Sequence, residues 1–193
     1  MDPITGKAYS VGLRDLHFAK FTQEGGSGLY LPPKKLSEAL TASITPNYSV
    51  TTLYADDRAV AVESALGDID IQLTIADLSD SDYEMLMGAA KNSDGVIEDS
   101  VDDVAPYGAL GFRIPLSGGG FRFYWYYKGR FQPPAQNHNT KGSGVEFQNP
   151  AISGKFMARE DGKWRARLTH IGTTANEVAD SWFNAVYKET VTP

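Results

Sequence analysis

Carboxylate pairs are the residues of this sequence that come closest to a catalytic arrangement. A glycoside hydrolase needs one carboxyl group as an acid and a second as a base or nucleophile. Three pairs fit that description by their spacing: Asp56-Asp57, Asp68 with Asp70, and Asp102-Asp103. However, adjacent acids on a strand point to opposite faces, and acids on an exposed face are usually solvated. We therefore expect no catalysis from them. The alternative, an acid-pair hydrolase, would show turnover that single Asp→Asn changes abolish.

Other familiar sites are missing from the sequence. There is no cysteine and there are three histidines, which excludes a thiolate zinc site, an iron–sulfur cluster and a cysteine nucleophile. A calcium loop does not fit residues 90–101, because Ala90 and Val101 stand where ligands belong. Gly118–Gly120 is not followed by the Lys-Ser/Thr of a phosphate loop. His17 fits a packed core or interface position better than a base. We expect no cofactor, no metal and no enzymatic activity.

The charges are segregated along the chain. The net charge is −6, which argues against a protein that grips phosphate backbones. Residues 56–103 hold 14 acidic and two basic side chains, whereas residues 104–167 hold ten basic and three acidic ones. Copies of one protein can set an acidic face against a basic one, which fixes their orientation. Alternatively, the two blocks only solvate different surfaces.

The length of 193 residues predicts one domain, spanning residues 1–193. No apolar run approaches the roughly 20 residues that a membrane helix needs, and Met1–Ser10 lacks a signal-peptide pattern. We expect a soluble intracellular protein, or one released by lysis, with no membrane partner.

Strand patterns dominate the chain. Leu13–Thr22 alternates, and Leu40–Thr45 is a second strand candidate that Pro46-Asn47 should stop. The clearest strand is Asp68–Ala76. Its isoleucines and leucine share one face, and its other face carries polar residues suited to water or a lumen: Asp68, Asp70, Gln72 and Thr74.

A short helix over Tyr83–Ala90 follows, with a capping box from Ser81 to Glu84 and Ser79 as a competing cap. A second helix is expected over Asn176–Tyr187. Further strands are expected at Tyr107–Leu116, Gly120–Arg130, Ala151–Glu160 and Trp164–Ile171. The fold class is therefore mainly β: a β-sandwich or barrel of about seven to nine strands with one flanking α-helix and a second helix near the C-terminus.

Ile44–Leu66 is predicted to be a long loop or excursion that contacts another copy of the protein. It is longer than a hairpin needs, and loops of that length are usually functional or disordered. Its apolar side chains would be costly in water unless a partner covered them. The candidate interface residues are Tyr48, Leu53, Tyr54, Asp56 and Asp57. The alternative is an extra hairpin packed on its own domain.

An ordered series of short phrases resembles one protein family over about Gly12 to Arg167. The phrases are GLRDL (Gly12–Leu16), TLYADD (Thr52–Asp57), ALGDI (Ala65–Ile69), ADL (Ala76–Leu78), VAPYG (Val104–Gly108), WYYKGRF (Trp125–Phe131), TKG (Thr140–Gly142), FQ (Phe147-Gln148) and FMAREDGKW (Phe156–Trp164). Their order resembles the phi13-type major tail proteins, the tail tube proteins of long-tailed bacteriophages and prophages. Thr169–Pro193 is an atypical C-terminal extension.

The resemblance implies a structural virion protein and no catalytic residues. It implies a β-sandwich with one flanking helix, whose subunits close into hexameric rings that stack into a hollow tail tube. The implied partners are further copies of the protein, the tape-measure protein, and the tail terminator and distal tail proteins. DNA would be passing cargo that is not tightly bound, and the protein would move from the host cytoplasm during assembly to the virion tail.

Two observations on the residues agree with this implication. Joining strands across subunits removes exposed sheet edges, and an acidic polar face would repel DNA phosphates in a lumen. The alternative is a carbohydrate- or receptor-binding β-sandwich module of a phage, which would use Trp125, Tyr126 and Tyr127 as a sugar platform. That alternative requires these aromatic rings to be exposed.

Overall fold

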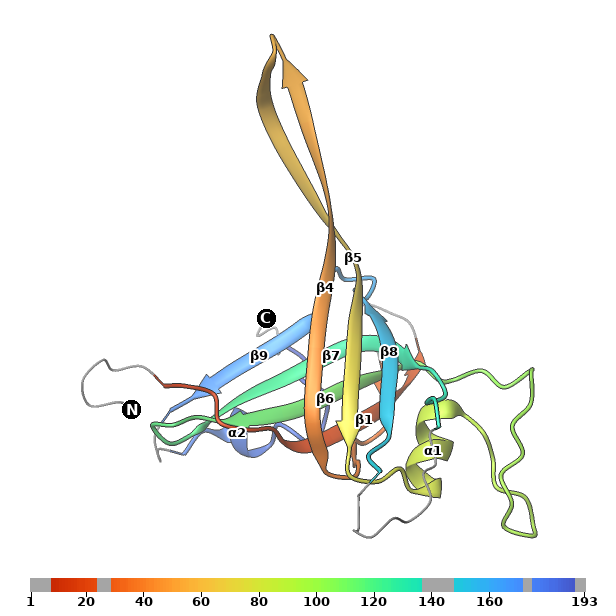
Figure 1. The fold of residues 1–193 in the computed structure, drawn as a ribbon. Coiled ribbons are helices and arrows are strands. Elements are labelled where there is room, and N and C mark those ends of the chain that lie inside the picture. The colour runs from red at the N-terminus through yellow and green to blue at the C-terminus, as the bar shows by residue number, and fades with distance from the viewer. Residues whose placement is uncertain (1–7, 24–28, 137–147, 172–174, 190–193) are drawn as a thin grey trace, which may run out of the picture.

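An antiparallel β-sheet that bends over on itself forms the body of the protein (Figure 1). The structure is a computed structural model and describes residues 8–23, 29–136, 148–171 and 175–189. Thr140–Gly142 and Phe147, which contribute to the family resemblance, lie outside these residues. The elements are β1 (Arg14–Gln23), β2 (Leu29–Tyr30), β3 (Lys34–Lys35), β4 (Ala39–Ala55), β5 (Arg58–Ile75), α1 (Asp80–Met87), β6 (Gly108–Pro115), β7 (Phe121–Phe131), β8 (Ala151–Met157), β9 (Arg165–His170) and α2 (Glu177–Asp180).

Strand β7 joins the two layers of the bent sheet. Along one edge it pairs with β6, which continues to β1 and β2. Along its other edge the first half pairs with β9 and the last residues pair with β8, which continues to β5 and β4. In Figure 1 the strands β4, β5 and β8 cross β1, β6 and β7 at a steep angle, as in orthogonally packed sandwiches. The prediction of a mainly β, sandwich-like fold is confirmed.

The main core lies between these layers and rests on the alternation of β5. Ile69, Ile71 and Leu73 are at most 1% exposed. They belong to one hydrophobic cluster with Phe18 of β1 and Leu110 of β6. Helix α1 adds its apolar side to the same cluster. The predicted division of β5 into an apolar face and a polar face is therefore confirmed.

Strand β7 is buried on both faces, as its aromatic sequence predicts. Tyr126 belongs to the main core, whereas Trp125 belongs to a second cluster with Trp182 from the C-terminal segment. The Trp125 indole Nε1 donates to the Trp182 carbonyl oxygen at 3.1 Å. Gly129 lets β7 approach β8 closely, because a Cβ there would lie 2.2 Å from the Phe156 ring.

Both helices differ in detail from the sequence prediction. The N-cap of α1 is Ser79 and not Ser81, since the Ser79 hydroxyl accepts from the Asp82 amide. The C-terminal helix α2 is a single turn that ends well before residue 187. In a longer helix the Trp182 carbonyl would accept a hydrogen bond from a backbone amide of the next turn. Here it accepts from the Trp125 indole of β7 instead. Tertiary contacts therefore shorten this helix.

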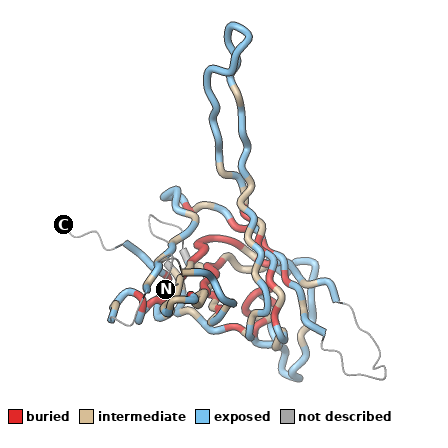
Figure 2. Tube along the Cα trace, turned by 60° about the vertical axis from the view of Figure 1, so that its left-hand side comes forward, coloured by how far each residue is buried: buried red, intermediate tan, exposed pale blue. Residues whose placement is uncertain are grey.

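Residues 44–66 do form an excursion from the body, but they are a paired hairpin and not a loop. Strand β4 continues through Pro46 to Ala55 and pairs with β5 along its whole length. Proline is tolerated there because β4 lies at the end of the sheet order. Figures 1 and 2 show the hairpin projecting far from the body as a twisted arm. The alternative of a hairpin packed on its own domain is also wrong. We define residues 48–66 as the arm.

Candidate functional site

The arm presents apolar side chains to solvent. Tyr48, Val50 and Val62 are 54%, 62% and 63% exposed, and the tube in Figure 2 is pale blue along nearly all of the arm. Cross-strand pairing places Tyr48 opposite Leu66, Val50 opposite Ser64, and Thr52 opposite Val62. Directly paired residues share a face of the ladder, and alternate residues return to it. One face of the arm is thus largely apolar, and nothing in the described chain covers it.

The tip of the arm is a two-residue turn of acidic residues. Asp56 and Asp57 have φ values of 51° and 59°, and Ala55 pairs with Arg58 across them. Positive φ at both central residues is the requirement of a type I′ hairpin turn, and aspartate tolerates it better than most residues. Beside the turn, Leu53 and Tyr54 are 63% and 69% exposed.

The five predicted interface residues are thereby brought together on one protruding element: Tyr48, Leu53, Tyr54, Asp56 and Asp57. Asp56-Asp57 is a turn and not an acid pair on a strand. The turn lies at the far end of the arm, away from the body (Figure 1). This position fits a contact with another molecule better than acid–base catalysis.

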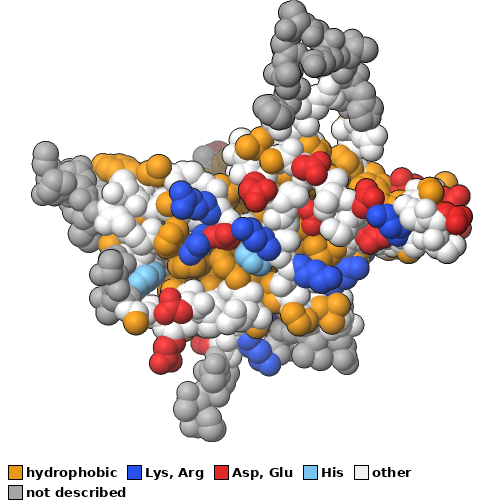
Figure 3. Space-filling model, turned by 90° about the horizontal axis from the view of Figure 1, so that it is seen from below, with side chains coloured by type: hydrophobic (Ala, Val, Ile, Leu, Met, Phe, Trp, Pro, Cys, Tyr) orange, Lys and Arg blue, Asp and Glu red, His pale blue; other side chains and the backbone are white. Residues whose placement is uncertain are grey.

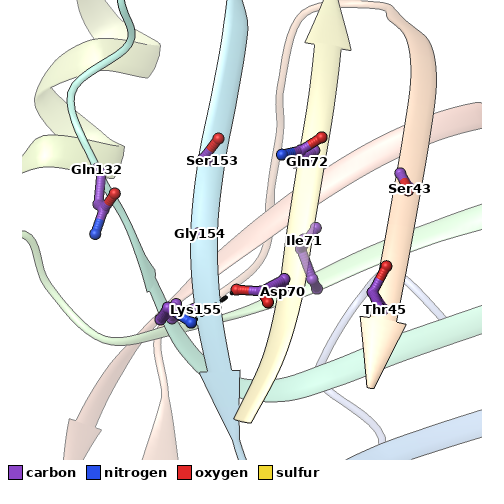
Figure 4. Close-up of a pocket in the computed structure, with 9 residues that line it drawn as sticks. All are labelled: Ser43, Thr45, Asp70, Ile71, Gln72, Gln132, Ser153, Gly154 and Lys155. Atoms are coloured by element: carbon purple, nitrogen blue, oxygen red, sulfur yellow. Dashed lines mark ion pairs between the residues drawn. The ribbon is translucent and has the colours of Figure 1, made fainter. Parts of the chain in front are cut away.

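The outer face of β4, β5 and β8 is polar, and we call it the polar face. The four predicted residues lie on it, since Asp68, Asp70, Gln72 and Thr74 alternate with the buried core residues of β5. Two of them, Asp70 and Gln72, line a shallow cavity of about 280 Å³ together with hydroxyl groups from the neighbouring strands. Figure 4 shows its side chains, with Ser43 and Ser153 beside Gln72 and Thr45 beside Asp70.

Lys155 of β8 neutralises part of the acidity of the polar face. Its ammonium group forms an ion pair with Asp68. It forms a second ion pair, at 2.9 Å, with Asp70 (Figure 4). Asn47 Nδ2 donates to the same two carboxylates at 3.0 and 2.8 Å. These hydrogen bonds from Lys155 and Asn47 lower the pKa of both Asp68 and Asp70. The group of three charges has a net charge of −1, so the polar face is less acidic than the sequence of β5 alone suggests.

The segregated charges meet partly within one subunit. The Lys155 pairs join the basic part of the sequence to the acidic part. The segment between α1 and β6 keeps its acids at the surface, and it also exposes Val96, Val101 and Val104 by 52%, 102% and 68%. Part of the segregated charge is therefore paired within the subunit, and part is exposed at its surface, where solvent or another copy could contact it.

The features that other functions would need are absent from the described residues. Trp125, Tyr126 and Tyr127 are at most 3% exposed, so they offer no sugar platform. Residues 8–23, 29–136, 148–171 and 175–189 contain no group of three or more His, Asp or Glu side chains that could hold a metal ion. Among these residues no helix has the length and apolar character needed to cross a membrane. His17 is half-buried at the edge of a groove, where its ring stacks on Phe183 at 4.2 Å.

The comparisons with known proteins add no relative. A scan against protein-family models finds no match, and a search of curated proteins finds none either.

Proposed function

We propose that this protein is the major tail (tube) protein of a long-tailed bacteriophage or prophage, a structural subunit without catalytic activity or cofactor. Its copies would close into hexameric rings, and the rings would stack into a hollow tube through which DNA passes during ejection. The observation that carries the proposal is the arm, which exposes apolar side chains that none of the described residues of the body covers. A second observation, the polar face, supports a water-filled lumen.

The arm is suited to binding and not to stabilising its own subunit. A paired hairpin is a costly way to expose apolar surface, since two isolated strands are marginally stable in water. Exposed apolar patches of this kind mark interaction sites. A contact between the arm of one copy and the body of the next joins different surfaces, and such heterologous contacts generate rings and helical stacks. We assign the arm to contacts between rings.

The polar face is suited to line a water-filled channel. It is made of hydroxyl, amide and carboxylate groups, and its one described ammonium group is held by two carboxylates. Free lysine or arginine would retain DNA by releasing counterions from its backbone. In this arrangement Lys155 cannot do so without first leaving Asp68 and Asp70. DNA would therefore pass as cargo and would not bind tightly.

The sheet also has an edge that a ring would cover. Strand β4 pairs with β5 on one side, and no described strand pairs with its other side. Long unpaired edges invite aggregation, and closure into a barrel removes them. Joining the layers of neighbouring subunits at this edge would extend the polar face around a closed channel. The proposed partners beyond the protein itself are the tape-measure, tail terminator and distal tail proteins, and the location is the virion tail after assembly in the host cytoplasm.

Sedimentation velocity over a wide concentration range tests this function. The expected result is self-association that proceeds through hexamers, or by rapid growth of larger assemblies once a nucleus has formed. Adding tape-measure protein should lower the concentration at which assembly begins. A monomer at every concentration, with and without the tape-measure protein, would contradict the proposal.

A further inference from the structure

A groove on the outer side of β1, formed by described residues, has no role in the proposed function so far. We call it the β1 groove. Its volume is about 830 Å³, and β1, β3, β6, β7 and the C-terminal segment contribute to its walls. The lining combines aromatic rings with charged groups and includes Asp15, Lys35, Arg113, Phe121, Phe183 and Asn184. This combination of apolar walls and a few polar groups is typical of binding sites.

The β1 groove faces away from the arm. Figure 3 views the molecule from below, whereas the arm rises from the opposite side in Figure 1. In this view histidine, Lys/Arg and Asp/Glu side chains gather around hydrophobic ones. His17 and His170 are the histidines of the described chain, and both line the groove, so the histidine colour in Figure 3 marks its position. The arm and the groove thus occupy opposite ends of the subunit.

One corner of the groove carries an excess of positive charge. Asp15 accepts from the Arg113 guanidinium at 2.5 Å, and its carboxylate lies 3.4 Å from the Lys35 ammonium, so two cations share one anion. Lys35 is more than half exposed. Asp15 has a φ of 54°, in the left-handed region that aspartate tolerates better than most residues.

The rest of the groove is a wall of flat aromatic groups. The Arg113 guanidinium lies 4.2 Å from the centre of the Phe121 ring. The His17 and Phe183 rings are stacked with an angle of 8° between their planes. Such rings accept a further aromatic or aliphatic side chain in offset or edge contact. The groove therefore fits a ligand that has an apolar part beside a carboxylate.

The tip of the arm has that composition. It places the exposed Leu53 and Tyr54 beside the carboxylates of Asp56 and Asp57. The arm extends about 25 Å beyond residue 48, at roughly 3.4 Å for each strand residue. It is long enough to reach into a neighbouring molecule, and it ends in a narrow turn.

We propose that the arm tip of one copy inserts into the β1 groove of the next copy. Tyr54 and Leu53 would pack on the aromatic wall, and the carboxylates of Asp56 and Asp57 would lie against the Lys35 corner. Asp180 of α2 lines the groove as well and would disfavour the reversed orientation. This inference rests on the proposed tube function and deepens it by naming the receiving site. Because donor and acceptor lie at opposite ends, the contact repeats head to tail.

The absence of cysteine from the chain allows a direct test. Two single-cysteine variants, Ala55→Cys at the arm tip and Asn184→Cys in the groove, are mixed under assembly conditions and treated with a short bifunctional thiol crosslinker. The expected product is a crosslinked dimer that contains one copy of each variant. Mixing Ala55→Cys with Val101→Cys is the matched control and should give little product, since Val101 is fully exposed but lies in the segment before β6.

Charge reversal provides the second measurement. Asp57→Lys and Lys35→Glu should each weaken association by about tenfold or more, and the double variant should recover much of the loss. Lys35 is exposed, so its replacement should leave the subunit folded. If the unaltered protein assembles but neither crosslinking nor charge reversal involves the β1 groove, this inference is wrong and the tube function stands. If the unaltered protein never associates, the tube function itself is contradicted.

Discussion

Shortening the arm should separate its role in assembly from its role in folding. Val50 and Ser64 are directly paired, so residues 51–63 can be replaced by Asn-Gly, which favours a two-residue hairpin turn. Apart from Thr52, which is half-buried, the side chains removed are exposed. Closing a shorter loop costs slightly less entropy. We therefore expect the free energy of unfolding to change by no more than about 1 kcal/mol and the melting temperature by no more than about 4 °C.

The effect on assembly should be much larger. The shortened arm loses Leu53, Tyr54, Val60 and Val62, which are between 54% and 69% exposed. Complete burial of such a side chain is worth about 1.5–3 kcal/mol, so covering the exposed part of each contributes roughly 1 kcal/mol. Together the four give roughly 4 kcal/mol, which corresponds to about a thousandfold in the association constant.

Separate assays measure the effect on folding and the effect on association. Circular dichroism melting reports the fold, and sedimentation velocity reports the association. A control variant replaces Val96, Val101 and Val104 with serine, since these valines are equally exposed but lie in the segment before β6. It should assemble like the unaltered protein. Unfolding of the shortened protein would contradict an arm that is dispensable for folding. Assembly as efficient as that of the control would contradict the assignment of the arm to contacts between copies.

Three further predictions concern the body of the subunit. Gly129→Ala should destabilise the fold by about 2 kcal/mol and lower the melting temperature by about 5 °C, because the new Cβ would lie 2.2 Å from the Phe156 ring; an unchanged melting curve would contradict the packing of β7 on β8. Lys155→Gln should raise the pKa of the two β5 aspartates toward ordinary values, because the side-chain hydrogen bonds from Lys155 now lower it; carboxyl NMR titration measures this, and unshifted values would disprove the pairing. Burial raises the pKa of Tyr30 and Tyr127 to about 12. The folded state therefore holds these protons more tightly than the unfolded state. The contribution of the two tyrosines to stability should be constant below about pH 10 and fall between pH 10 and 12. Denaturant melts over this range measure the fall, and flat stability would contradict it.

The sequence predicts the core strands well because their side chains alternate with a clear period. In β5 the alternation from residue 68 onward identifies both the buried face and the polar face. In β7 the unbroken aromatic sequence indicates burial on two sides, and the structure supplies a separate cluster for each side. Local patterning is enough in these elements because the core decides which residues lie inside.

The arm could be predicted only in part. Pro46 predicts the end of a strand, because proline cannot donate a hydrogen bond to a neighbouring strand. Strand β4 lies at the end of the sheet order, where that missing hydrogen bond has little cost. Asp56-Asp57 between two alternating segments is the signal that could have revealed the hairpin turn. The ion pairs of Lys155 depend on the register of β8 against β5, which residue spacing does not encode. The β1 groove likewise depends on contacts between residues far apart in the chain.

Electron microscopy of the concentrated protein, with tape-measure protein present as a nucleus, tests the central proposal most directly. The expected images show stacked rings of six subunits around an open channel, with the polar face of β4, β5 and β8 lining the channel and each arm reaching into the next ring. Monodisperse single subunits at every concentration would contradict the proposal, and so would closed assemblies without a channel.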